Sequence, residues 1–141
     1  MIRVKRIDHV AIAVAGMSDY ETRLRELFGA RPGAREHVAT QKTDVAFLHA
    51  ADGETTVELI APAGNESLQK FVDKRGTALH HICFEVDDIR QALTDLKAAG
   101  VPLVDETPRP GARGHLVAFL HPKATGGVLF ELCQATAGHA P

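Results

Sequence analysis

Two histidines and two glutamates occupy matching positions in the two halves of this 141-residue chain. His81 follows His9 by 72 residues, and Glu131 follows Glu58 by 73 residues. Imidazole and carboxylate groups together suit a divalent first-row transition metal. A duplicated unit that supplies one histidine and one glutamate twice therefore predicts a pseudo-symmetric metal site with four protein ligands.

The surroundings of these residues repeat in the same register. The stretch 7–14 is answered by 79–86, Val-Ala-Phe-Leu-His at 45–49 recurs at 117–121, and Val-Glu-Leu at 57–59 is answered by Phe-Glu-Leu at 130–132. A lone strand histidine is more often a hydrogen-bonded core or surface residue, and a lone strand glutamate is usually solvated. Because both the histidines and the glutamates match in register, a role as metal ligands is favoured for these four residues. His49 and His121 also match each other, but at strand ends, where a turn-stabilising role is equally compatible.

The alternation of side chains across a strand predicts which face each candidate occupies. His9 and His81 lie opposite the bulky apolar residues of their strands, and hence on the face turned away from the helices. Glu131 stands between Phe130 and Leu132. A carboxylate with two large apolar neighbours needs a compensating cation or partner when it is buried.

The hydrophobic pattern predicts two units of the order β-α-β-β-β. In the first unit, a helix that Ser18 or Asp19 caps and Gly29 ends follows the first strand. A short helix that begins at 65–67 connects the units. Strands are expected near 6–14, 34–39, 44–50, 55–61, 79–86, 102–106, 116–121 and 127–133, and the helix of the second unit near 88–99.

Four antiparallel strands with one covering helix leave a concave face free in each unit. We therefore predict an α+β fold in which two tandem βαβββ modules form a cradle-like mixed sheet around the metal site. The length suits one domain over residues 1–141, with module 1 at about 6–62, a connector at about 63–77 and module 2 at about 78–134. The small, polar tail after Gln134 is expected to fray.

The composition argues against several classes of protein. The net charge of −2 gives no basic excess for nucleic acid, and no apolar stretch approaches the roughly 20 residues that span a bilayer. A strand follows the basic N-terminus instead of the apolar core of a signal peptide, which favours a cytoplasmic protein. Cys83 and Cys133 form no CxxC motif and are expected to be reduced and partly buried.

The chain resembles the vicinal oxygen chelate superfamily and, within it, the methylmalonyl-CoA epimerase family. The resemblance spans residues 6 to 134. The more specific part is Phe-Leu-His-Pro-Lys at 119–123, followed by Gly-Gly-Val-Leu at 126–129, because glyoxalases share the His/Glu pattern. The other matching stretches are 8–14, 57–62, 80–86, 111–114 and 130–132.

The resemblance implies a metal-dependent epimerase that acts at C2 of methylmalonyl-CoA. It implies that His9, Glu58, His81 and Glu131 ligate the metal, for which cobalt, nickel, manganese and zinc are all compatible. The metal would hold the thioester and carboxylate oxygens and stabilise the enolate, and Glu131 would also be one of two acid/base groups. The implied partners are an acyl-CoA thioester substrate and a second copy of the chain in a homodimer.

Three cations in predicted loops, Arg109, Arg113 and Lys123, could meet phosphate or carboxylate groups of such a substrate. Solvation of each of them by water is an equally compatible interpretation.

One segment departs from the family. The family usually has Glu-Gln-Gly-Val before its third strand, and that glutamate is the other base. The corresponding stretch here is Thr-Gln-Lys-Thr at 40–43, so Thr40 occupies the base position. A threonine hydroxyl cannot abstract such a proton unaided. Glu36, His37 and Asp44 are close in sequence and are candidates to replace it.

Two other functions remain open. A glyoxalase-like lyase or isomerase could shuttle a proton through a metal-bound glutamate, so that loss of the extra base would do less harm. A non-catalytic small-molecule binder on the same cradle is the third hypothesis, although a simple binder has little use for two carboxylates held against a metal.

Overall fold

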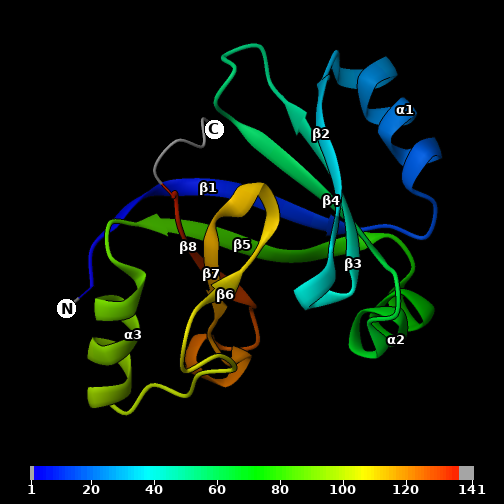
Figure 1. The fold of residues 1–141 in the computed structure, drawn as a ribbon. Helices are drawn as coiled ribbons and strands as arrows, with labels where there is room; N and C mark the ends of the chain where they lie inside the picture. The colour runs from blue at the N-terminus through cyan, green and yellow to red at the C-terminus, as the bar shows by residue number, and fades with distance from the viewer. Residues whose placement is uncertain (1, 137–141) are drawn as a thin grey trace. The chain divides into compact units, whose positions relative to one another are not determined.

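The structure is a computed structural model that describes residues 2–136 (Figure 1). It divides into two compact units: residues 9–80, here the central unit, and residues 1–8 with 81–141, here the terminal unit. The described residues contain eight strands and three α-helices, which confirms the α+β class. The modules predicted at 6–62 and 78–134 stay a prediction, and most of the tail expected to fray lies outside the described residues.

The central unit contains four strands in the order β2-β3-β4-β1. Strands β2 (Arg31–Val38), β3 (Thr43–His49) and β4 (Thr56–Pro62) form an antiparallel meander. Strand β1 (Val4–Ala13), of which residues 9–13 belong to this unit, runs parallel to β4. The expectation of four antiparallel strands was therefore wrong for β1. A helix crosses over between β1 and β2, and such a crossover allows the first strand to join the meander in the parallel sense.

The terminal unit repeats this arrangement in the order β5-β8-β7-β6. Strand β5 (Ala78–Val86), of which residues 81–86 belong to this unit, runs parallel to β8, and the other neighbours are antiparallel. The remaining strands are β6 (Arg109–Pro110), β7 (Leu116–Phe119) and β8 (Phe130–Gln134).

The strand predicted at 102–106 was wrong. This segment makes a single bridge, between Leu103 and Leu120. The backbone N–H groups of Val104 and Asp105 both donate to the carbonyl oxygen of Phe119, at 3.0 and 3.1 Å. Because two successive N–H groups converge on one oxygen, the alternating pattern of a ladder does not form there.

The three helices largely follow the predicted signals. Asn65 caps α2 (Glu66–Arg75) by accepting from the N–H of Leu68, and α3 (Ile89–Ala98) has the same arrangement at Asp88. Helix α1 (Met17–Phe28) ends at Gly29, whose φ of 64° is left-handed, but its N-cap is Gly16 and not Ser18 or Asp19. Asp19 lies instead in the first turn, where a carboxylate stabilises the positive end of the helix dipole. Among the described residues, no helix is long and apolar enough to cross a membrane.

Each unit packs a helix against one face of its own strands, α1 in the central unit and α3 in the terminal unit. Ile89 and Leu93 of α3 lie in a cluster with Ala118, Leu120 and Leu132. Leu24 of α1 packs in a second cluster, built on Val14, Ala46, Leu48 and Leu59. Because side chains alternate across a strand, the neighbouring residues of each strand occupy the face that the helix does not cover.

A buried ion pair ties the start of β1 to the loop before β7 in the terminal unit. The Arg113 guanidinium donates to Asp8 Oδ2 at 2.5 Å, and Arg6 donates to Asp8 Oδ1 at 3.2 Å. The side chains of Asp8 and Arg113 are 2% and 12% exposed. Arg113 has a φ of 58°, a left-handed conformation that is uncommon for a residue other than glycine. Arg113 is therefore a buried structural partner and not the solvated loop cation of one sequence interpretation.

Loss of this ion pair should destabilise the protein more than loss of an exposed pair. For Arg113→Met we expect a decrease of about 3 kcal/mol in the free energy of unfolding, because removal of one partner leaves a buried charge. The control Lys97→Met breaks the exposed pair with Glu106 and should cost less than about 1 kcal/mol. Urea unfolding followed by circular dichroism measures both, and equal effects would contradict the assignment.

Candidate metal centre

In the central unit, the parallel pairing of β1 and β4 brings His9 to Glu58. Glu58 is the register partner of Ala11, two residues after His9 on the same face. His9 Nε2 lies 3.8 Å from Glu58 Oε2. Phe47, which is opposite Glu58 on β3, meets the imidazole in a T-shaped contact with 6.3 Å between ring centroids. These three side chains form a His–Phe–Glu triple.

The terminal unit builds the same triple from β5, β7 and β8. Glu131 is the register partner of Cys83, two residues after His81, and Phe119 is opposite Glu131. His81 Nε2 lies 3.4 Å from Glu131 Oε1. The rings of His81 and Phe119 are perpendicular, with 5.1 Å between their centroids. The repeat in the sequence is thus a repeat in geometry, and it includes the two phenylalanines.

Each histidine–glutamate pair has the spacing of two ligands of one ion. All four side chains are buried, and burial of a carboxylate is costly without a compensating partner. Two ligand atoms at about 2.1 Å from a metal are separated by about 3.0 to 3.4 Å in octahedral or tetrahedral geometry. The pair in the terminal unit has this separation, and the pair in the central unit needs only a small approach. Each pair, one imidazole and one carboxylate, therefore suits a divalent cation.

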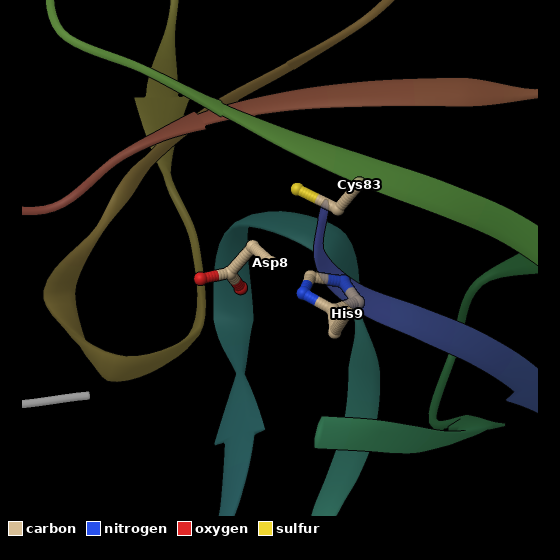
Figure 2. Close-up of side chains that lie close together, drawn as sticks. All are labelled: Asp8, His9 and Cys83. Carbon is tan, nitrogen blue, oxygen red and sulfur yellow. The ribbon is translucent and has the colours of Figure 1, made fainter. Parts of the chain in front are cut away.

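A second buried cluster in the terminal unit contains groups of ligand type. Atoms of Asp8, His115 and Cys133 all lie within 4.8 Å of one another, as do atoms of Asp8 and Cys83; Figure 2 shows the Asp8 carboxylate and the Cys83 thiol. The thiolate is the form that binds metals, but burial, and a hydrogen bond with Cys133, raise the pKa of Cys83 well above its usual value. The carboxylate of Asp8 already faces Arg113, so this cluster suits a cation poorly.

Both cysteines are free and buried, as the sequence predicted. They form a small cluster with Val117.

The remaining candidate residues have local partners. His121 Nδ1 accepts a hydrogen bond from the N–H of Lys123 at 3.1 Å and caps a short 3-10 helix, which supports the turn-stabilising interpretation. His49 Nδ1 lies 3.2 Å from Thr56 Oγ1. Arg109 Nε lies 3.6 Å from a carboxylate oxygen of Asp105, and Lys123 is exposed.

Thr40 lies in a 3-10 turn, Ala39–Gln41, directly before β3. Lys42, the residue that follows this turn, has a φ of 49°, a left-handed conformation that favours glycine. The carbonyl oxygen of Gln41 accepts from Asn65 Nδ2 and from Thr43 Oγ1, both at 2.8 Å, and these bonds fix the turn that carries Thr40.

Phe47 and Phe119 were not among the residues that the sequence predicted for the site. The repeated Val-Ala-Phe-Leu-His stretch carried the signal, since it places one aromatic residue at the same position in each unit.

Comparison with known proteins identifies the family. Residues 8–119 match the model of the glyoxalase/bleomycin resistance protein/dioxygenase superfamily. The mitochondrial methylmalonyl-CoA epimerase of Dictyostelium discoideum is 38% identical over 93% of the chain and 79% of its own length. The ethylmalonyl-CoA/methylmalonyl-CoA epimerase of Cereibacter sphaeroides is 37% identical over 93% of this chain and 98% of its own length.

A solved structure gives the same result. A variant of Streptomyces coelicolor methylmalonyl-CoA epimerase, in complex with 2-nitronate-propionyl-CoA, superimposes with a TM-score of 0.89 at 30% identity and covers 99% of this chain and 100% of that one. These relatives are epimerases, which supports an isomerase. The chain belongs to the glyoxalase/bleomycin resistance protein/dioxygenase superfamily, in which it resembles the methylmalonyl-CoA epimerases.

Proposed function

We propose that this protein is a metal-dependent epimerase that acts at C2 of methylmalonyl-CoA. The duplicated, buried His–Phe–Glu triple is the observation that carries the proposal, because it supplies four ligands of the types that a divalent metal binds. The epimerase relatives support the substrate. A cytoplasmic location and a homodimer stay predictions from the sequence.

The proposed ligands of one ion are His9, Glu58, His81 and Glu131. Two carboxylates balance the charge of a divalent cation, and two neutral imidazoles complete a set that cobalt, nickel, manganese or zinc accepts. When bound, such an ion supplies Lewis-acid chemistry at the substrate carbonyl. Phe47 and Phe119 contact the imidazoles edge to face, and these contacts would hold the rings in position.

Glu131 is also proposed as an acid/base group. Its carboxylate would take the proton from C2 on one face of the acyl group, while the bonding electrons remain on the substrate as an enolate. Its conjugate acid would return a proton to that same face. The reacting C–H bond is acidic enough for a carboxylate only when the developing charge is stabilised, so this role depends on the same buried site.

A glyoxalase-like activity is the second candidate. The family match is shared with glyoxalases, and the sequence predicts a threonine, Thr40, at the position of the second base. Turnover of methylglyoxal with a thiol cofactor would favour this alternative.

The carboxylate ligands can be tested without a catalytic assay. We expect wild-type apoprotein to bind one Co²⁺ ion per chain in isothermal titration calorimetry. Glu58→Gln should weaken binding by at least about 100-fold, because even residues that only support a ligand contribute about 10- to 100-fold. Glu54→Gln, which changes an exposed acid in the turn before β4, is the matched control. Unchanged affinity in Glu58→Gln would remove this residue from the site.

The reaction itself can be followed in D₂O. We expect the cobalt-loaded protein to introduce deuterium at C2 and to invert both (R)- and (S)-methylmalonyl-CoA, with NMR reporting exchange and configuration together. Chelation of the metal should abolish both signals. If neither isomer takes up deuterium at high protein concentration, the epimerase is excluded.

A further inference from the structure

We propose that Glu36 is the second acid/base residue of this site and acts on the face of C2 opposite to the face that Glu131 serves. The inference rests on the proposed function. It names the residue of this chain that carries a proton where Thr40 cannot.

Inversion of a carbon centre requires two positions for the proton. One carboxylate that removes a proton and returns it to the same face of a planar enolate regenerates the starting configuration. A second proton carrier must therefore approach from the other face. Glu131 belongs to the terminal unit, and the second carrier is proposed on the sheet face of the central unit that carries Glu58.

The register of three strands places Glu36 on that face. Glu36 on β2 pairs with Val45 on β3, and Val45 pairs with Ile60 on β4. Cross-strand partners share a face, and residues two apart on one strand also share it. Ile60 is two residues after Glu58, so Glu36 lies on the face of Glu58 and Phe47.

The register also sets the distance between Glu36 and Glu58. Two strand spacings of about 4.8 Å and one step of two residues, about 7 Å, separate their Cα atoms by about 12 Å. Glu36 is partly buried, whereas its neighbours Arg35 and His37 are exposed.

The other two candidates from the sequence lie on the wrong face. His37 and Asp44 are register partners, and His37 Nδ1 lies 2.9 Å from Asp44 Oδ1. Arg35, which shares their face, donates to Glu21 of α1 at 2.7 Å. This contact shows that the face of His37 and Asp44 is the one that the helix covers, opposite to the face of Glu58.

His49 is the remaining titratable residue to consider on the face of Glu58. Its Nδ1 is directed at Thr56 Oγ1, and its Nε2 is packed so closely on Gly33 that a Cβ there would lie 2.4 Å away. The imidazole is thus held between the backbone of β2 and the side chain of Thr56. His49 is therefore assigned to the hairpin and not to proton transfer.

The step balances without an oxidant or a reductant. The C2–H bond breaks, an O–H bond forms on Glu36, and the electron pair remains on the substrate as an enolate. The conjugate acid of Glu131 then donates a proton to the other face of C2. In the reverse direction, Glu131 removes the proton and Glu36 returns one.

The test is Glu36→Gln in the metal-loaded full chain, with (R)- and (S)-methylmalonyl-CoA followed separately in D₂O. We expect inversion of both isomers to fall at least about 100-fold, the contribution typical of a general base. Exchange with retention should persist for the one isomer whose C2–H faces Glu131. Glu36→Asp, which retains a carboxylate, should invert at least tenfold faster than Glu36→Gln, and Asp44→Asn, on the helix-covered face, should behave as wild type.

The outcomes separate the two proposals. If wild-type protein exchanges neither isomer, the epimerase proposal fails, and the role of Glu36 fails with it. If wild type inverts both isomers and Glu36→Gln does so at a similar rate, only the role of Glu36 is overturned. The thermal unfolding midpoint and Co²⁺ affinity of Glu36→Gln are measured alongside, and loss of inversion with both unchanged supports a proton-transfer role.

Discussion

The cost of burying two carboxylates is the constraint on which the rest of the structure depends. Glu58 and Glu131 are buried in the middle of apolar strands, where an ionised carboxylate is unfavourable unless a cation or hydrogen-bond donor faces it. In each unit an imidazole on the parallel neighbour strand lies close to the carboxylate, at 3.8 Å for Glu58 and 3.4 Å for Glu131. The crossover through a helix makes the parallel pairing possible, and the parallel pairing brings each imidazole to its carboxylate.

The sequence predicted the faces of the strands better than their partners. Period-two alternation places His9 and His81 opposite the helix-facing residues, and the clusters around α1 and α3 confirm this assignment. The same alternation carries no information about strand direction, which is why β1 and β5 were expected to be antiparallel to their neighbours. The segment at 102–106 is apolar enough for a strand, but its N–H groups converge on Phe119, and no local pattern predicts such a contact. The role of Arg113 was equally hidden, because its partner Asp8 is distant in sequence.

The geometric repeat extends beyond the repeat that the sequence displays. A 3-10 turn precedes β3 at Ala39–Gln41, and another precedes β7 at Ala112–Gly114. Lys42 and Gly114, which are 72 residues apart, are both left-handed, with φ values of 49° and 69°. The residue types differ, so the resemblance is one of backbone conformation. The chain tolerates a lysine at the first position although glycine adopts this conformation more readily.

The two turns are fixed by different interactions, and this difference gives a pseudo-symmetric fold its asymmetry. The turn of the terminal unit is tied down by the ion pair of Arg113 and Asp8, whereas Asn65 and Thr43 hold the turn of the central unit through one carbonyl oxygen. Inversion of C2 requires a proton carrier at each of its two faces, and four equivalent metal ligands alone do not supply two such carriers. The position 72 residues after Glu36 is Pro108, which has no proton to exchange. A carboxylate in only one copy of the duplicated unit therefore supplies an asymmetry that the duplicated ligands lack.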